Sequence, residues 1–548
     1  MKHIITHLSC TALAIGQFTP ALAKPTDPSG DRRVSIAYVA DIHAQIEPKP
    51  ELFWADGKED YVRDAGGLSR IATVFNELRA QRPEEMVFID GGDTIQGSGP
   101  AAWTEGKVVV EPMNAIGLDV AIPGNWSVAY GAAAWKTRSA EFNYKMVAAN
   151  MADDAGNQLH DPYVIREING VRMGIIGFTE PAIPTRQPPF MSEGLGFQGT
   201  EVLQPLIDEL RNEKNADLIV VATHIGLPKA VSLAESLVGV DIMLSSDTHE
   251  RTYDPIIRGD TWIVEPGAFG SFVGLLDIHV NADNEITDRS WRLIELRPEL
   301  FPEDPEVKKI VDQALAPHRE RMNRVIGHTN VWLARYAVLN TSIDNVITDA
   351  IRSKTGADIA LSNGFRFAPA TAPGAITEAD LWTWLPVNLQ LKTGQASGAQ
   401  LLEYWENEFE NVFSSDPERL FGGWLPRISG LKVEFNRDAA PGERLRQLIF
   451  DGAPIDPDQS FSITAGHRPG APEHMIHRVP KCEMIRKVEQ TTHDAVRTYL
   501  NNHSPILNEG AGNVRCLDYS GIIRSQYLES MDVSAAPHLK STDVLDAH

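Results

Sequence analysis

Five short segments of this chain place metal-binding side chains directly after apolar runs. They are Asp41-Ile42-His43, Gly91-Gly92-Asp93, Gly124-Asn125, Thr223-His224 and Asp247-Thr248-His249. Carboxylate, imidazole and amide groups are common ligands of divalent metal ions in proteins. Asp41, His43, Asp93, Asn125, His224, Asp247 and His249 supply enough donors for two ions that share one carboxylate. The five segments together therefore predict a single dinuclear metal centre.

The elements that must position these side chains are short buried strands. Four apolar, β-branched runs have the pattern of strands covered on both faces: residues 34–40, 86–89, 217–222 and 240–244. In layered α/β folds, the loops at the carboxyl ends of strands converge on one side of a rigid sheet. A lone Asp-x-His segment occurs at many strand ends as a cap, but an ordered series of five such ends indicates a metal site.

The segments resemble those of the calcineurin-like metallophosphoesterases, specifically the secreted 5′-nucleotidase branch with two domains. The resemblance covers roughly residues 33 to 505 and includes residues 65–68, 171–178 and 267–274. It implies that Asp41, His43 and His249 hold one metal, that Asn125, His224 and Asp247 hold the other, and that Asp93 bridges both. It also implies two divalent ions, with Mn²⁺ favoured and Zn²⁺, Mg²⁺ or Fe²⁺ as alternatives.

The fold implied by this resemblance is α/β. A four-layer metallophosphoesterase sandwich, two sheets flanked by helices, is followed by a smaller α/β C-terminal domain of the 5′-nucleotidase type. We expect a signal peptide at residues 1–23, a catalytic domain at 32–297, a linker helix at 298–325, a substrate-binding domain at 326–520 and a tail at 521–548.

Two positions depart from the family pattern. The family has the motif G-N-H-E-x-D at the third of these segments, and the His and Asp of that motif form a dyad that contacts the phosphoryl oxygen. Here Trp126 and Ala129 stand in place of both dyad members. Asp247 stands where the family has His, and its hard oxygen donor favours Mn²⁺ or Mg²⁺ over softer ions.

Trp126 also resembles the residue found at this position in the thiosulfohydrolase of bacterial sulfur oxidation, a relative of the nucleotidases. Residues 363–366 and 424–431 share that resemblance. The substrate is therefore open between a phosphoester and a sulfur-bearing group on a carrier protein.

The second domain supplies the substrate-binding candidates if the family plan holds. Arg366, after Asn363 and Gly364, aligns with the family's N-G-G-G-I-R loop, where an Arg grips phosphate or carboxylate through its planar fork. Arg427 is a second candidate. Phe365, Phe421 and Trp424 are candidates for stacking on a nucleobase, although such aromatics are at least as often packing residues. A surface or core role is expected for His160, His328, His467, His474 and His477, although His467 with its neighbour Arg468 follows another predicted strand and is kept as a candidate.

The composition of the chain restricts the compartment and the binding partners that we expect. The formal charge of −24 over 548 residues excludes a bulk nucleic-acid binder but not a small anionic substrate. A basic start, an apolar stretch and Ala21-Leu22-Ala23 predict a secretory signal, and no later segment has the length of a membrane span, so we expect an exported periplasmic or secreted protein without a membrane anchor. Cys482 and Cys516 remain after the signal, either as one disulfide or as two separate thiols.

Three functions fit these residues. The first is a metal-dependent phosphoesterase of the 5′-nucleotidase type that releases phosphate from nucleotides or related phosphoesters, with Asn125, Trp126 and Arg366 as catalytic candidates. The second is a thiosulfohydrolase-like enzyme that cleaves sulfate from a cysteine-linked carrier protein. The third is a binding protein of the same fold that has lost catalysis.

Overall fold

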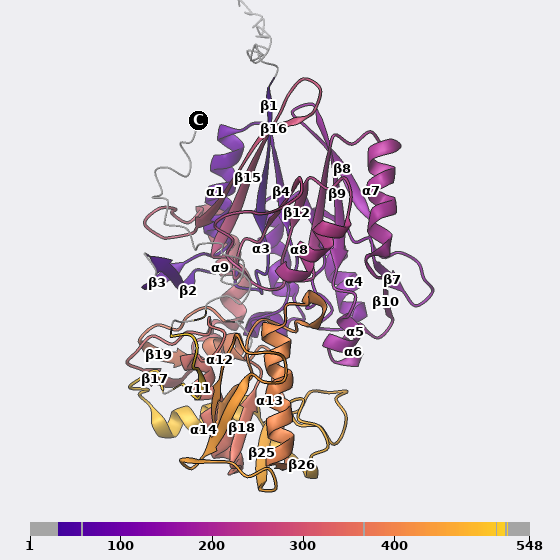
Figure 1. Cartoon of the computed structure of the whole chain (residues 1–548). Coiled ribbons are helices and arrows are strands. Elements are labelled where there is room, and N and C mark those ends of the chain that lie inside the picture. Colours follow the sequence, from indigo (N-terminus) through magenta and orange to yellow (C-terminus); the bar gives the residue numbers. More distant parts are fainter. Residues whose placement is uncertain (1–30, 56–57, 365–367, 511, 521–522, 524–548) are drawn as a thin grey trace, which may run out of the picture.

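The computed structural model describes residues 31–55, 58–364, 368–510, 512–520 and 523. The chain forms two domains, the first in indigo to magenta and the second in orange to yellow in Figure 1. The predicted signal peptide (residues 1–23) and Arg366 lie outside the described residues. Of the predicted tail (residues 521–548), only Ile523 is described.

Two six-stranded sheets build the first domain. One has the order β16 (Ile286–Glu295), β15 (Phe272–Val280), β1 (Arg32–Val39), β4 (Met86–Asp90), β5 (Val120–Ala121) and β6 (Lys145–Met146). The other has the order β13 (Ile256–Arg258), β14 (Thr261–Val264), β12 (Ile242–Leu244), β11 (Leu218–His224), β9 (Val171–Thr179) and β8 (Tyr163–Ile168). Strands β1, β4, β5 and β6 pair in parallel, as do β9, β11, β12 and β14, so their carboxyl ends lie together.

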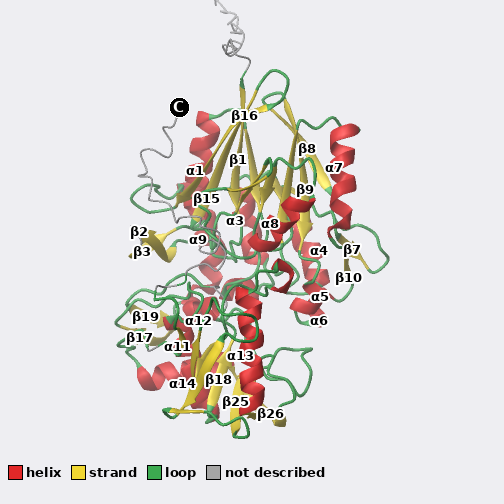
Figure 2. Cartoon of the chain, in the orientation of Figure 1, coloured by secondary structure: helices red, strands yellow, loops and turns green. Residues whose placement is uncertain are grey.

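Both faces of each sheet are buried, which explains the continuous apolar runs. Along β1, Ile36 and Tyr38 belong to the core between the two sheets, whereas Ala37 and Val39 face the helices α1 (Leu68–Gln81), α3 (Lys107–Ala115) and α9 (Pro305–Leu315). Helices α7 (Leu203–Asn212) and α8 (Leu227–Ser236) cover the outer face of the second sheet. Figure 2 shows the helices in red on both sides of the yellow sheets. The four-layer sandwich expected from the sequence is confirmed.

Helix α9 begins the connection between the domains. The Asp304 carboxylate caps it by accepting hydrogen bonds from the backbone N–H groups of Glu306 and Val307, and Pro305 follows at the first helical position. Its apolar face packs on the first domain through Val307 and Val311. The short helices η2 (Ala316–His318) and α10 (Arg319–Met322) then lead to β17 (Val325–Thr329).

The second domain is a smaller α/β unit. Its main sheet has the order β21 (Arg427–Ser429), β18 (Ile359–Ser362), β25 (Ser460–Gly466), β20 (Gln390–Ser397) and β26 (Glu483–Thr491). Helices α11 (Ser342–Thr355), α12 (Glu378–Trp384) and α14 (Thr492–His503) share one core with this sheet, and α13 (Gly398–Phe413) shares another. A second sheet has the order β24 (Ala453–Pro454), β23 (Leu445–Phe450), β22 (Lys432–Phe435) and β27 (Val514–Cys516).

Shorter elements complete the described chain. They are β2 (Lys49–Ala55), β3 (Lys58–Ala65), α2 (Gly99–Trp103), α4 (Ala132–Glu141), β7 (Met151–Asp153), α5 (Ile183–Arg186), α6 (Pro189–Ser192), β10 (Leu195–Phe197), η1 (Thr200–Val202), β19 (Gly374–Thr377) and η3 (Pro417–Arg419). Cys482 and Cys516 are buried free thiols, so the alternative of two separate cysteines holds. Within the part of the chain that the structure describes, every helix is too short or too polar to span a bilayer.

Candidate metal centre and interdomain cavity

The seven candidate ligands lie at the carboxyl ends of parallel strands from both sheets. Asp41 and His43 follow β1, Asp93 follows β4 and Asn125 follows β5 in the first sheet. In the second sheet, His224 is the last residue of β11, and Asp247 and His249 follow β12. Strand β1 enters at the far end of the first domain and runs toward the second domain in Figure 1. The ligand loops therefore face the domain interface.

The side chains of these loops meet in two overlapping groups. Asp41, His43 and His249 form one group in which the Nε2 atoms of the two histidines are 3.1 Å apart. Asp41, Asp93 and His224 form the other, in which Asp93 Oδ2 lies 3.2 Å from His224 Nε2. Asp93 Oδ2 is also 3.8 Å from His43 Nε2. Both carboxylates thus lie between the groups, and either is placed to be shared by two ions.

Several buried polar atoms of this cluster have no hydrogen-bond partner among the described residues. They are Asp41 Oδ1, Asn125 Oδ1 and His224 Nε2. Leaving a buried polar atom unpaired is costly, and such atoms normally find a partner in a folded protein. Divalent cations would satisfy the oxygen lone pairs of Asp41 and Asn125 directly, and the Nε2 lone pair of His224 once that atom has released its proton. The residues present therefore fit a metal site.

The outer nitrogens of two candidate ligands are held by backbone carbonyls. His43 Nδ1 lies 3.0 Å from Gln96 O, and His224 Nδ1 lies 2.7 Å from Gly91 O. A proton on Nδ1 in these hydrogen bonds leaves the Nε2 lone pair for a metal, which is the usual arrangement of ligating histidines. Burial lowers the pKa of His43 to about 4, so its imidazole is neutral at pH 7. Burial also disfavours the charged form of His224, but the carboxylates of Asp93 and Asp41 outweigh this and raise its pKa well above the ordinary value.

The ligand loops have an unusual backbone. Asp41, His43, Asp93, Asp247 and His249 all adopt positive φ angles, between 47° and 89°. Non-glycine residues rarely adopt this region, and where they do they concentrate at functional sites. Gly124 allows the tight approach of two of these loops, because a Cβ atom there would lie 2.1 Å from Asp93 Oδ1.

Asp247 joins the centre to a guanidinium group. Its Oδ1 accepts a hydrogen bond of 2.6 Å from Asn125 Nδ2, and its Oδ2 lies 3.1 Å from Arg186 Nη1. The same Nη1 atom donates to Glu180 Oε2 at 2.6 Å, and Glu180 is fully buried. Arg186, at the end of α5, is thereby held beside the ligand cluster.

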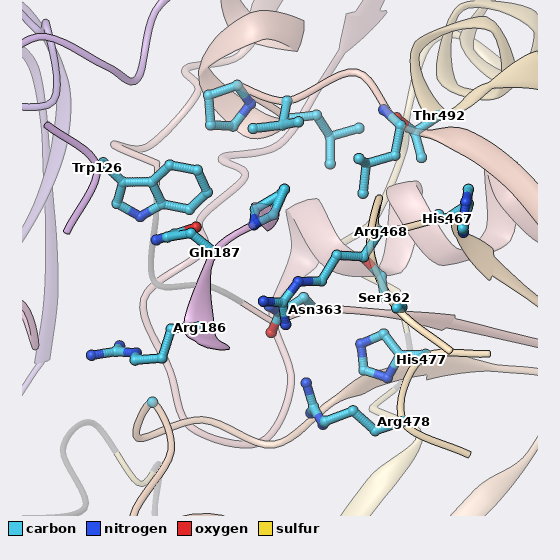
Figure 3. Close-up of a pocket in the computed structure, with 18 of the residues that line it drawn as sticks. Trp126, Arg186, Gln187, Ser362, Asn363, His467, Arg468, His477, Arg478 and Thr492 are labelled. Atoms are coloured by element: carbon cyan, nitrogen blue, oxygen red, sulfur yellow. The ribbon is translucent and has the colours of Figure 1, made fainter. Parts of the chain in front are cut away.

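Trp126 lies at the mouth of the centre. Its backbone N–H donates to Asp93 Oδ1 at 2.7 Å, and its partly buried indole lines the cavity (Figure 3). The backbone N–H of Ala129 donates to Trp126 O at 3.0 Å, so the two positions of the missing dyad share one turn. The indole fills space beside the ligands without offering a charge.

A cavity of about 250 Å³ connects the ligand cluster to the second domain. His43, Asp93, Asn125, Asp247 and His249 line one end. The first domain also contributes Trp126 and residues of the segment 186–191. The second domain lines the rest with residues that include Asn363 and Trp424, and the Trp424 indole N–H donates to Asn363 Oδ1 at 3.1 Å. A substrate held here contacts both domains.

Two other candidates lie elsewhere. Arg427 is buried and does not line the cavity; it donates to the carbonyl oxygens of Ala337, Val338 and Gly364 and pairs with Asp344 at 3.1 Å. Those contacts hold a loop junction together. Gly364 likewise does not line the cavity, because it packs against the Arg427 side chain. Arg366 and Phe365 lie outside the described residues.

Other cavity residues were not singled out by their sequence pattern. Arg186 follows the end of β9, a strand-end loop of the second sheet, and that position is the signal that identifies it. Arg478 and His477 repeat the His-Arg pair of residues 467 and 468, and all four line the cavity (Figure 3). His477, which the sequence suggested was a surface or core histidine, is a half-buried wall residue whose Nδ1 lies 2.8 Å from the Tyr404 hydroxyl.

Comparison with protein families and curated relatives agrees with this two-domain arrangement. Residues 34–251 match the calcineurin-like phosphoesterase family, and residues 325–466 match the 5′-nucleotidase C-terminal domain. The chain is 22% identical over 460 residues to the trifunctional nucleotide phosphoesterase protein YfkN of Bacillus subtilis, which covers 74% of this chain but only 30% of that relative. It is 24% identical over 485 residues to the 5′-nucleotidase of Bos taurus, and this match covers 80% of each chain.

Two solved structures share the whole fold. The sulfate thiohydrolase SoxB of Thermus thermophilus matches with a TM-score of 0.78 at 22% identity, over 90% of this chain and 98% of the other. A 5′-nucleotidase precursor of Thermus thermophilus matches with a TM-score of 0.76, also at 22% identity, over 89% of this chain and 100% of the other. The chain therefore combines a calcineurin-like phosphoesterase domain with a 5′-nucleotidase C-terminal domain, and these matches support a metal-dependent hydrolase that acts on phosphoester bonds.

Proposed function

We propose that this protein is an exported phosphoesterase of the 5′-nucleotidase type that releases phosphate from nucleotides or related phosphoesters. One observation carries the proposal: the candidate ligand cluster opens into a cavity whose other walls come from both domains. A phosphoryl group at the cluster would leave the alcohol part of the substrate against Asn363, Phe421 and Trp424. The predicted secretory signal supports export to the periplasm or the medium.

The proposed metal ligands are the seven residues of the cluster. Asp41, His43 and His249 would hold one ion, and Asp41 or Asp93 would be shared with a second ion held by Asn125, His224 and Asp247. Bound together, two divalent ions, for which we propose Mn²⁺, supply Lewis-acid polarisation of the phosphoryl group and a more acidic water for attack.

Arg186 takes over charge neutralisation in this proposal, because Trp126 and Ala129 replace the family's dyad. Its guanidinium lines the cavity and pairs with Asp247 at 3.1 Å. Such a fixed cation favours a transition state in which negative charge grows on the phosphoryl oxygens. Asn125 orients Asp247 through the hydrogen bond from its Nδ2. Arg366 stays a predicted phosphate ligand.

A sulfur-bearing carrier protein is the second candidate substrate. Its support is Trp126, whose indole lines the cavity beside the ligand cluster where the family has a dyad histidine. An indole offers a hydrophobic wall to a sulfur-bearing arm but no proton to a leaving alcohol.

One assay set tests the proposal. Metal-reconstituted protein is given AMP, other phosphomonoesters and a peptide that carries a thiosulfonate on cysteine, and phosphate and sulfate release are measured. We expect phosphate release from AMP that depends on added Mn²⁺ and disappears in Asp93→Ala, with the exposed-residue variant Asp458→Ala as control. Sulfate release from the peptide without phosphate release from any ester would replace the nucleotidase proposal with the carrier-protein one, and inactivity on all substrates would contradict both.

A further inference from the structure

The far wall of the cavity is formed largely by one basic loop. This loop, residues 467–482 between β25 and β26, contributes the two pairs His467-Arg468 and His477-Arg478 to the lining. All four side chains are half-buried. Figure 3 shows Arg468 and Arg478 with their guanidinium groups directed into the space between the domains.

Arg468 is the cavity-lining arginine of this loop that has no acid paired with it among the described residues. One of its nitrogens donates to Thr185 O of the first domain at 2.7 Å, and no carboxylate among the described residues pairs with it. Partial burial lowers its pKa, and the neighbouring guanidiniums of Arg478 and Arg186 lower it further. The charge of Arg478, by contrast, is compensated by Glu408, because its guanidinium donates one hydrogen bond to each carboxylate oxygen, at 2.7 and 2.6 Å. Of the two arginines that this loop contributes to the lining, Arg468 is therefore the one whose charge no carboxylate among the described residues compensates.

His477 and Arg478 occupy the two central positions of a tight hairpin turn. Ile476 and Val479 exchange backbone hydrogen bonds of 3.1 and 2.9 Å around them, and their φ angles are 46° and 69°. Two-residue turns with positive φ at both positions strongly favour Asn and Gly. A His-Arg pair at such positions is strained, and strained backbone of this kind concentrates at ligand sites. His477 Nε2 is moreover buried and has no hydrogen-bond partner among the described residues.

The loop is held in place from both domains. The buried Lys392 of β20 donates through Nζ to the carbonyl oxygens of Glu473 and Met475. Gly470, with a φ of 81°, approaches the first domain so closely that a Cβ atom there would lie 2.3 Å from Pro189 Cδ. The basic side chains are therefore presented by a braced loop, which lowers the entropy lost when they grip a ligand.

We propose that Arg468, with His477 and Arg478, forms a second anion subsite that binds a phosphate or carboxylate on the leaving group of the substrate. The proposal rests on the phosphoesterase function proposed above and narrows its substrates to phosphoesters that carry a second anionic group. The Phe421 ring, the exposed aromatic of this wall, already has the guanidiniums of Arg186 and Arg478 at 5.7 and 5.6 Å from its centroid. These contacts hold the two guanidiniums together beside the proposed subsite.

Matched substrates test the subsite. AMP is compared with adenosine 3′,5′-bisphosphate, and glycerol 1-phosphate with 3-phosphoglycerate, so that each pair differs by one phosphate or one carboxylate. We expect kcat/KM to be about 10–100-fold higher for the doubly anionic member of at least one pair, mainly through KM, which is the range of a charge-assisted hydrogen bond. The two pairs tell a phosphate site from a carboxylate site. Equal kcat/KM within both pairs, with AMP hydrolysed, overturns the subsite and leaves the phosphoesterase intact.

Variants connect the preference to the loop. Arg468→Gln should bring the ratio of kcat/KM within each substrate pair close to one, and Arg468→Lys should restore most of the preference. His477→Asn places a residue that tolerates positive φ in the turn, so the thermal midpoint should stay or rise while the preference falls several-fold. The control Arg515→Gln, at an arginine whose side chain is 67% exposed, should leave the ratio unchanged. A ratio that survives Arg468→Gln contradicts the proposal.

A binding measurement keeps the subsite testable if no phosphoester is hydrolysed. The full chain, stripped of metal with a chelator, is titrated with pyrophosphate in a calorimeter. Binding that weakens about 10-fold or more in Arg468→Gln but not in Arg515→Gln supports the subsite even when the phosphoesterase proposal fails. Absence of binding, or binding unaffected by Arg468→Gln, overturns it.

Discussion

Arg186 and Asp247 form an ion pair of 3.1 Å that connects a candidate metal ligand to the wall of the interdomain cavity. Arg186 Nη1 also donates to the buried Glu180 at 2.6 Å. The guanidinium is thus fixed between two carboxylates, beside the turn where Trp126 and Ala129 replace the acid–base dyad of related enzymes. This relationship gives the cavity wall a fixed cation beside a candidate metal ligand.

Replacing Arg186 tests this role. Arg186→Ala should lower kcat by about 10²–10³-fold, the range measured when one fixed donor to transition-state charge is removed. Among the described residues it also leaves the buried Glu180 with Lys229, whose Nζ is 3.6 Å away, as its remaining cationic partner, so the thermal midpoint should fall. Arg186→Lys keeps a charge and should recover part of kcat. An unchanged kcat in Arg186→Ala would show that the guanidinium only braces the loop.

Asp247 is expected to determine metal preference. Asp247→His exchanges a hard oxygen donor for imidazole, so the variant should retain metal and shift from Mn²⁺ toward Zn²⁺. The check is metal content after reconstitution in equal concentrations of both ions. Asp247→Asn, which keeps an oxygen near Asn125 and loses only the charge, is the matched control. Complete loss of bound metal in the His variant would contradict a simple exchange of ligands.

The paired positions of Trp126 and Ala129 allow the dyad to be restored. They share one turn, with Ala129 N–H donating to Trp126 O at 3.0 Å. Trp126→His combined with Ala129→Asp should therefore raise turnover of phosphomonoesters, by up to the roughly 10²–10⁴-fold that a positioned general acid supplies. Trp126→His alone is the control and should gain less. If the double variant instead loses hydrolysis of a thiosulfonate peptide and gains nothing on AMP, the carrier-protein function is favoured.

His493 should make stability depend on pH. Burial lowers its pKa to about 4 from 6.5, against a hydrogen bond to Leu385 O that favours the charged form. Between pH 6.5 and 4 the unfolded chain takes up a proton at His493 that the folded chain does not. The stability that comes from keeping His493 neutral is therefore fully present above pH 6.5, and the free energy of unfolding falls as the pH falls from 6.5 to 4. His493→Gln should reduce the slope of unfolding free energy by up to about 1.4 kcal/mol per pH unit.

Urea titrations of metal-stripped protein at several pH values give this slope. The exposed His328→Gln variant of the same domain is the control and should keep the wild-type slope. An unchanged slope in His493→Gln would mean that His493 is protonated in the folded state.

The sequence by itself determined the layers of the fold and the strand ends that carry the candidate metal ligands. Runs such as 34–40 and 217–222 are apolar at every position because both faces of their strands are buried, and the structure has β1 and β11 there. Because strand ends are local features, the loops with Asp41, Asp93, His224 and Asp247 were identifiable as neighbours. The two-domain order followed from a family resemblance that the matches at 34–251 and 325–466 confirm.

Only the tertiary structure decided which charged side chains face the cavity. Arg427 and Arg468 both follow predicted strand or loop patterns in the second domain, yet one is enclosed by backbone carbonyls and Asp344 while the other reaches Thr185 of the first domain. A guanidinium on a long flexible stem can point in many directions from the same backbone position. Its partners come from chain segments tens to hundreds of residues away, so the residues next to an arginine in the sequence do not predict them.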